Sequence, residues 1–172
     1  MALRQALLLA IVSGVISLGV NFISPGGIPL VGDYYEFRVE GGVIVPPAAE
    51  AGDPPFIAAD RARAEFELGT ALFIDAREPE EFACGTIRGS VSLPFEYLPA
   101  ENLASYIDSV LGGASPEKTL IAFCSGEECD LSLHLARNLQ ALGYRDVLIF
   151  FGGAREWEKL GFEMERRADC GA

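Results

Sequence analysis

The sequence predicts an α/β protein in which a small parallel β-sheet is flanked by helices and preceded by one N-terminal transmembrane helix. Two observations in the 172-residue chain support this prediction. Short apolar runs alternate with helical stretches, which is typical of βαβ units. A continuous apolar segment near the N-terminus is long enough to cross a hydrocarbon core. Half of the residues are hydrophobic, so we expect a packed core rather than a disordered chain.

The first expected element is a helix over residues 6–23, which are apolar apart from serines, glycines and one asparagine. At about 1.5 Å per residue this segment extends for about 27 Å, close to the thickness of a hydrocarbon core. Pro25 and the glycines after it end the helix. Arg4 precedes the segment and Asp33 opens the far flank, so the positive-inside tendency places the rest of the chain outside the cytoplasm. A cleaved signal peptide and a buried soluble helix are the alternatives.

The chain divides by composition into an anchor, a linker, a domain and a tail. Proline and glycine are frequent after the anchor, and one hairpin is expected around Gly41 and Gly42. The expected boundaries are 1–23 for the membrane anchor or signal-like segment, 24–56 for the linker, 57–165 for the domain and 166–172 for the tail.

Helices and strands alternate through the domain. Asp60 is expected to cap a helix that runs to about residue 68, where Gly69 ends it. The apolar runs, each with the length of a strand buried on both faces, are residues 72–74, 91–93, 120–123 and 147–151. Further helices are expected over residues 79–83, 100–111 and 130–142. Ligand sites of parallel sheets lie at the carboxyl ends of the strands, so we expect the site there.

Cys124 stands at the carboxyl end of the third strand, and a five-residue turn leads from it into the next helix. The residues of this turn are Ser125, Gly126, Glu127, Glu128 and Cys129. Such a turn points several backbone N–H groups into one small concave site, and the positive end of the helix adds to their effect. A thiol there is expected to ionise readily, and the thiolate is the nucleophile. The arrangement suits a negatively charged sulfur such as a persulfide, Cys–S–S⁻.

Several further motifs occur in order through the domain. They are residues 73–82 (FIDAREPEEF), 85–90 (GTIRGS), 142–144 (LGY), Val147, Gly152-Gly153, Trp157 and Gly161. Together with the Cys124 turn, this set resembles the rhodanese (sulfurtransferase) family over residues 57–165. The resemblance implies the fold predicted above, and a reaction in which a cysteine takes sulfane sulfur from a donor and passes it to a nucleophilic acceptor.

The resemblance also assigns roles to residues. It implies that Cys124 is the catalytic cysteine and that the backbone of residues 125–129 stabilises its persulfide. The supporting residues that it implies are Asp75, Arg77, Gly152 and Gly153. The implied partners are a sulfur donor and a thiol or protein acceptor, and no cofactor is implied. The hydrophobic anchor suggests a partner in or near the same membrane, such as a membrane redox protein.

The turn departs from the family's pattern in its charge. Glu127, Glu128 and Asp130 stand where family loops often carry a basic residue, and these carboxylates are expected to raise the pKa of Cys124 and to repel thiosulfate. A protein-bound or uncharged donor fits better. Thr86 stands where the family commonly has histidine.

The other cysteines leave alternatives open. Cys129 would reach disulfide range of Cys124 if the turn closes tightly, and would then resolve a persulfide or a sulfenic acid; otherwise it is a small buried side chain. Cys84 is expected either to pack in a turn or to pair with another cysteine. Cys170 is expected to be exposed in a tail with little to order it.

Three hypotheses of function follow. The first is a membrane-tethered sulfurtransferase or persulfide carrier that uses Cys124. The second is an exported thiol–disulfide redox module that uses Cys124 and Cys129, and the third is a non-catalytic domain that binds a partner at the membrane. The net charge of −12 argues against nucleic acid, and Asp130, six residues after Cys124, argues against a phosphatase. No metal site is expected, because the single histidine, His134, and the scattered cysteines lack ligand spacing.

Overall fold

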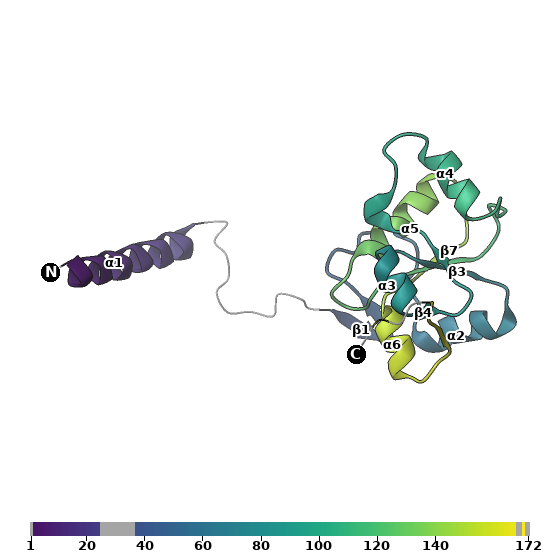
Figure 1. Cartoon of the computed structure of the whole chain (residues 1–172), viewed down its shortest axis with the longest axis horizontal. Coiled ribbons are helices and arrows are strands. Elements are labelled where there is room, and N and C mark those ends of the chain that lie inside the picture. Colours follow the sequence, from purple (N-terminus) through teal and green to yellow (C-terminus); the bar gives the residue numbers. More distant parts are fainter. Residues whose placement is uncertain (1, 25–36, 168–169, 171–172) are drawn as a thin grey trace. The chain divides into compact units, whose positions relative to one another are not determined.

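The computed structural model describes residues 2–24, 37–167 and 170, and the chain forms two units (Figure 1). The first unit, within residues 1–34, contains helix α1, Ala2–Ile23. The second unit begins at residue 35 and is an α/β domain. The predicted helix end at Pro25, the acidic flank at Asp33 and most of the tail lie outside the described residues.

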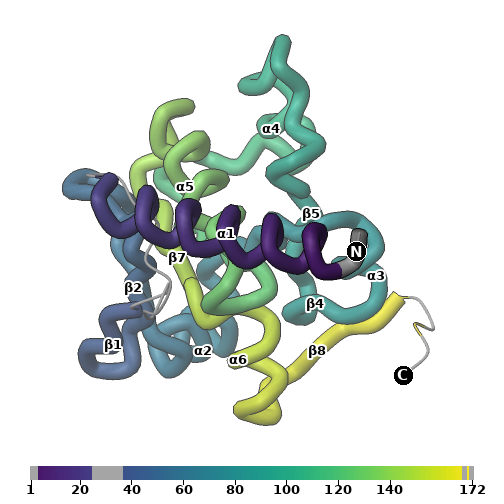
Figure 2. The backbone as a smooth tube through the Cα atoms, turned by 90° about the vertical axis from the view of Figure 1, so that its left-hand side faces the viewer, coloured from purple at the N-terminus to yellow at the C-terminus, as the bar shows by residue number. Residues whose placement is uncertain are grey.

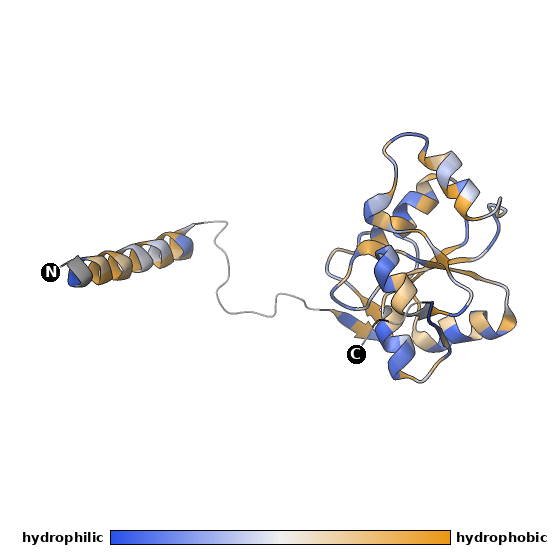
Figure 3. Cartoon of the chain, in the orientation of Figure 1, coloured by the Kyte–Doolittle hydropathy of each residue, from blue (hydrophilic) through white to orange (hydrophobic). Residues whose placement is uncertain are grey.

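Helix α1 is apolar over Arg4–Ile23, and none of this stretch is buried (Figure 3). By length and composition it is able to cross a membrane. A signal sequence near the N-terminus would meet the same criteria.

The domain is built on a parallel sheet of four strands in the order β5-β3-β6-β7. The strands are β3 (Leu72–Asp75), β5 (Val91–Ser92), β6 (Leu120–Phe123) and β7 (Val147–Phe150). Every residue of β6 and β7 is buried, as predicted for strands covered on both faces. The prediction was wrong for β5, whose residues are only half-buried. This strand lies at one edge of the sheet, whereas Phe56 pairs with Ile149 of β7 along the opposite edge.

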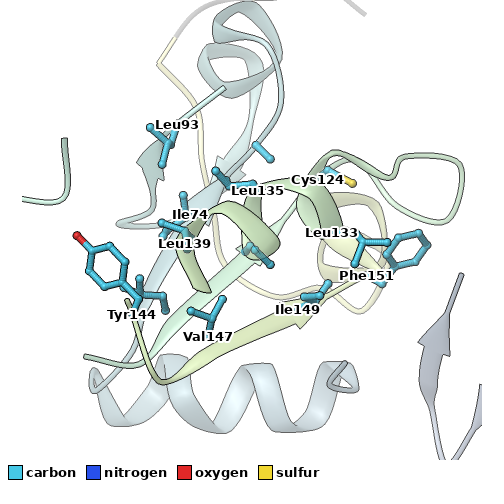
Figure 4. Close-up of a cluster of buried hydrophobic side chains, with 14 of the residues drawn as sticks. Ile74, Leu93, Cys124, Leu133, Leu135, Leu139, Tyr144, Val147, Ile149 and Phe151 are labelled. Carbon is cyan, nitrogen blue, oxygen red and sulfur yellow. The ribbon is translucent and has the colours of Figure 1, made fainter. Parts of the chain in front are cut away.

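Successive residues of a strand point to opposite faces of the sheet, and in β6 and β7 all of them are apolar and buried. Helices therefore cover both faces of the sheet. On one face, Ile74, Ala122 and Ile149 belong to a core shared with α4 (Leu103–Val110) and α5 (Leu131–Ala141). On the other face, the core includes α2 (Ala59–Leu68) and α6 (Gly153–Lys159), and Trp157 is fully buried there. Figure 4 shows the first core, with Cys124 at one end of it beside the helix that carries Leu133 and Leu135.

Two helices begin at positions other than those predicted. Helix α2 begins earlier, at Ala59, so Asp60 lies inside the first turn, where its charge favours the helix dipole, and does not cap the helix. Helix α4 begins at Leu103 rather than near residue 100, because Asn102 has a left-handed backbone with φ of 59° that a helix does not accommodate.

The remaining elements are short. They are helix α3 (Pro79–Cys84), the 3₁₀-helix η1 (Phe95–Tyr97), and strands β4 (Thr86–Ile87) and β8 (Met164–Glu165), which pair antiparallel (Figure 2). Cys84, at the end of α3, forms a disulfide with Cys170. Of the two alternatives for Cys84, pairing with another cysteine is the one observed. Cys170 is exposed, but the disulfide attaches it to the domain, whereas we expected little to order it.

The predicted hairpin is present before the domain's first helix. Strands β1 (Arg38–Glu40) and β2 (Val43–Val45) pair antiparallel around Gly41 and Gly42. Within the segment expected to be a linker, this hairpin contributes buried Ile44 to the core of the domain. Phe37 and Phe56 also pack against this core, and Phe56 pairs with Ile149 at the edge of the sheet.

Candidate active site

Cys124 follows the carboxyl end of β6 and is 0% exposed, on the face of the sheet that α5 covers. The turn after it, residues 125–129, is named the catalytic loop for the role that the resemblance implies. It curls back to the start of α5, and the Cys129 N–H donates to the Gly126 carbonyl oxygen at 2.9 Å. The expected strand–loop–helix arrangement around the cysteine is therefore present.

The first turn of α6 holds the catalytic loop from the other side. The N–H of Ala154 donates to the Cys124 carbonyl oxygen at 2.8 Å, and that of Arg155 to the Ser125 carbonyl oxygen at 3.1 Å. Gly153 has a φ of 62°, and a Cβ at this position would lie 2.3 Å from the Cys124 carbonyl oxygen. At Gly152, a Cβ would overlap the Glu156 carboxylate that folds over it. Gly153 thus lets the backbone of α6 approach the loop closely, whereas Gly152 leaves room for the side chain of Glu156.

Asp75 and Arg77 form a buried ion pair at the end of the neighbouring strand β3. Arg77 donates to the Asp75 carboxylate from Nε at 2.9 Å and from Nη2 at 2.6 Å, and Asp75 is 0% exposed. The buried Thr86 hydroxyl donates to the same carboxylate at 2.7 Å, a contact that sequence reasoning missed. Burial opposes the charge of Arg77, but its hydrogen bonds and charge interaction with Asp75 raise the pKa of Arg77 overall.

Glu81 connects this ion pair to the catalytic loop. Its carboxylate accepts a hydrogen bond from the Ser125 hydroxyl at 3.0 Å and lies 3.7 Å from Nη1 of Arg77. Glu81 also lies in the first turn of α3, where an acidic charge favours the helix dipole. Its four-residue spacing from Arg77 is the signal that would have indicated the contact.

The environment of the Cys124 thiol differs from the prediction that it ionises readily. Its Sγ lies 2.7 Å from the Cys129 carbonyl oxygen and 3.5 Å from the Ser132 hydroxyl oxygen. Burial, followed by the hydrogen bond to Cys129, raises the pKa of Cys124 well above its ordinary value. We expected the carboxylates of Glu127, Glu128 and Asp130 to raise the pKa of Cys124, but burial is the main cause of its rise. Burial therefore favours the neutral thiol of Cys124 over its thiolate.

Cys129 is the more acidic thiol of the pair. Its half-buried sulfur accepts a hydrogen bond from Cys124 and further ones from the backbone N–H groups of Ser125 and Leu131. These bonds, with that from Cys124 as the largest contribution, lower the pKa of Cys129 to about 7, although burial opposes the change. N–H groups that we expected to surround a Cys124 persulfide therefore point at the sulfur of Cys129.

The outer side of the loop carries charges of both signs. Glu127 and Glu128 are exposed, and Glu128 lies 3.9 Å from the guanidinium of Arg155. A cavity of about 270 Å³ lies on this side, lined by Gly126, Glu127, Glu128, Gly152, Arg155, Glu156 and Lys159. Within the part of the chain that the structure describes, no cluster of three or more metal-ligating side chains occurs. The ring of His134 stacks on the ring of Phe95, with 5.4 Å between the ring centroids.

Comparison with known proteins gives three findings. Residues 58–160 match the family model of the rhodanese-like domain. The human single-domain sulfurtransferase TSTD1 is 25% identical, with a TM-score of 0.52, over 63% of this chain and 97% of its own. A thiosulfate sulfurtransferase from Pseudomonas aeruginosa is 22% identical, with a TM-score of 0.55, over 67% of this chain and 21% of that one.

A curated relative is similar over the same region. It is the HTH-type transcriptional regulator Rv0324 of Mycobacterium tuberculosis, 27% identical over 105 residues. The similarity covers 61% of this chain and 42% of the regulator, so this chain spans less than half of that relative's length.

Proposed function

Since the chain belongs to the rhodanese-like domain family, we propose that it is a membrane-tethered sulfurtransferase or persulfide carrier whose sulfane sulfur is bound to Cys124. The sulfurtransferases among its structural neighbours support a role in sulfur transfer in general. The observation that carries the proposal for this chain is the position of Cys124, buried at the carboxyl end of β6 beneath a loop that Glu81 and α6 hold in place.

The contacts suggest how the reaction begins. The buried Cys124 thiol must lose its proton, and the sulfur of neighbouring Cys129, whose pKa is lowered to about 7, is the proposed base. The Cys124 thiolate attacks the outer sulfur of a donor R–S–S–H, the donor's S–S bond breaks, and R–S⁻ leaves. An acceptor thiolate then takes the outer sulfur, and Cys124 leaves as the thiolate.

The partners that we propose are a sulfane-sulfur donor and a thiol or protein acceptor, a membrane redox protein among them. Exposed Glu127 and Glu128 beside the loop disfavour a dianionic donor such as thiosulfate. A protein-bound or uncharged donor is therefore preferred in this proposal.

The proposed location of the domain is the exported side of a membrane, with α1 as a single-pass anchor. The Cys84–Cys170 disulfide supports this location, because disulfides persist in oxidising compartments and are rare in the cytosol. Arg4, on the N-terminal side of the apolar stretch, supports the same orientation.

Sulfur transfer from glutathione persulfide to an acceptor thiol by the full chain in detergent tests the proposal. Cys124→Ser should lower the rate at least about 100-fold, the scale of losing a covalent nucleophile. The matched control is Cys124→Ser combined with Ser109→Cys, which restores the number of thiols at an exposed position. Transfer by either variant at the rate of the unmodified chain would refute the role of Cys124.

A second candidate is a thiol–disulfide redox module, which is favoured by the contact between the two thiols. In that case, oxidation would remove about two hydrogens from the loop without any gain of sulfur. Cys129→Ser would then abolish the activity even when no sulfane donor is present.

A further inference from the structure

The two free cysteines of the chain stand at the two ends of the catalytic loop. The turn closed by Gly126 brings Cys129 back above the end of β6, where its carbonyl oxygen lies 2.7 Å from the Cys124 sulfur. The Cys124 thiol donates to that oxygen, and the interaction between the two cysteine side chains contributes to the pKa shift of each. The two cysteines are therefore neighbours in the folded loop, although they are five residues apart in the sequence.

The loop also separates the two sulfurs by environment. Cys124 is 0% exposed, among apolar side chains of the core. Cys129 is half-buried at the start of α5, and its sulfur accepts hydrogen bonds from the backbone N–H groups of Ser125 and Leu131. A persulfide formed on Cys124 would thus have a nucleophilic sulfur held directly beside its inner sulfur.

We propose that Cys129 resolves the Cys124 persulfide, so that the domain releases the sulfane sulfur as hydrosulfide and retains a Cys124–Cys129 disulfide. This inference rests on the proposed function, because it needs a persulfide on Cys124. An external thiol or dithiol then reduces the disulfide and completes the cycle. The domain would thereby act as a persulfide reductase in addition to a sulfur carrier.

The resolving step balances without any oxidant. The Cys129 sulfur attacks the inner sulfur of the persulfide, a Cys129–Cys124 sulfur–sulfur bond forms, and the bond between Cys124 and the outer sulfur breaks. The outer sulfur leaves with the electron pair of that bond. The single proton shared by the Cys129 thiol and the persulfide leaves with it, so the product is HS⁻.

The test uses the full chain in detergent, first reduced at the loop and then mixed with glutathione persulfide in the absence of oxygen. Hydrosulfide is measured with a sulfide electrode, and the protein by intact mass with peptide mapping. Cys129→Ser traps the intermediate, Cys129→Ala guards against a folding defect of the first variant, and Cys124→Ser removes the persulfide.

The unmodified chain should release about one hydrosulfide per chain and lose about 2 Da at Cys124 and Cys129. The Cys129 variants lack the proposed base, so they should gain about 32 Da at Cys124 more slowly; once they carry this sulfur, they should release hydrosulfide at least about tenfold more slowly than the unmodified chain. The Cys124 variant should show neither change.

Three results would overturn the inference, and they separate it from the proposed function. If the unmodified chain keeps the gain of about 32 Da without releasing hydrosulfide, Cys129 does not resolve the persulfide, while the proposed function stands. If the Cys129 variants accumulate glutathione on Cys124 instead, the disulfide arises from a mixed disulfide with the donor. If no arm gains sulfur at Cys124, the proposed function fails together with the inference.

Discussion

The ionisation of Cys129 can be tested without any sulfur donor. Its pKa is lowered to about 7 from an ordinary value near 9.0, mainly by the hydrogen bond from Cys124. At pH 7 about half of Cys129 is therefore thiolate, against about 1% for the ordinary thiol, a gain of about 50-fold. A thiolate of lower pKa is a weaker nucleophile, and a Brønsted slope of about 0.4–0.5 over two units removes about six- to tenfold. The net expectation is exchange that is about five- to eightfold faster at pH 7.

The assay is thiol–disulfide exchange with an uncharged aromatic disulfide, followed by the absorbance of the released thiol between pH 5 and 10. Because the pKa of Cys129 is lowered, its rate should rise as pH increases through about 7 and level off above it. Cys124→Ala removes the main hydrogen-bond donor, so the midpoint should move to higher pH and the rate at pH 7 should fall, at most about eightfold.

Cys129→Ala serves as the control, since the phase with a midpoint near pH 7 must disappear when this thiol is absent. A midpoint near 9 in the unmodified chain, or one that Cys124→Ala leaves unchanged, would refute the reasoning that the Cys124 thiol stabilises the Cys129 thiolate.

Other predictions concern stability, measured by chemical denaturation of the full chain in detergent. Arg77→Met leaves the Asp75 carboxylate buried without its cation and should cost about 3–5 kcal/mol; a cost below about 1 kcal/mol would contradict a structural ion pair. Gly153→Ala meets a backbone carbonyl at 2.3 Å in a left-handed conformation and should cost at least about 1–3 kcal/mol, whereas Gly112→Ala, with open space around it, shows the conformational cost alone. Cys84→Ser frees a crosslink between residues 86 apart and should cost about 2–4 kcal/mol, and adding a reductant to the unmodified chain should reproduce this loss.

Much of the fold could be predicted because its signals are local in the sequence. The runs that form β6 and β7 are apolar at every position, as expected of strands that are covered on both faces. Both strands are present in the structure as predicted. The boundaries were less predictable. Asn102 delays α4 by adopting a left-handed backbone. β5 is half-buried while β7, at the opposite edge, is buried and pairs with Phe56, a difference that the residues of the two strands do not encode.

The sequence by itself determined that a cysteine stands at the carboxyl end of a buried parallel strand, followed by a short turn into a helix. Only the tertiary structure decided which of the two thiols is the more acidic, because the pKa values of Cys124 and Cys129 depend on burial and on the donors and acceptors that loop closure brings to each sulfur. The same holds for the pairing of Cys84 with Cys170, since α3 and the end of the chain meet only once the domain has folded around its sheet.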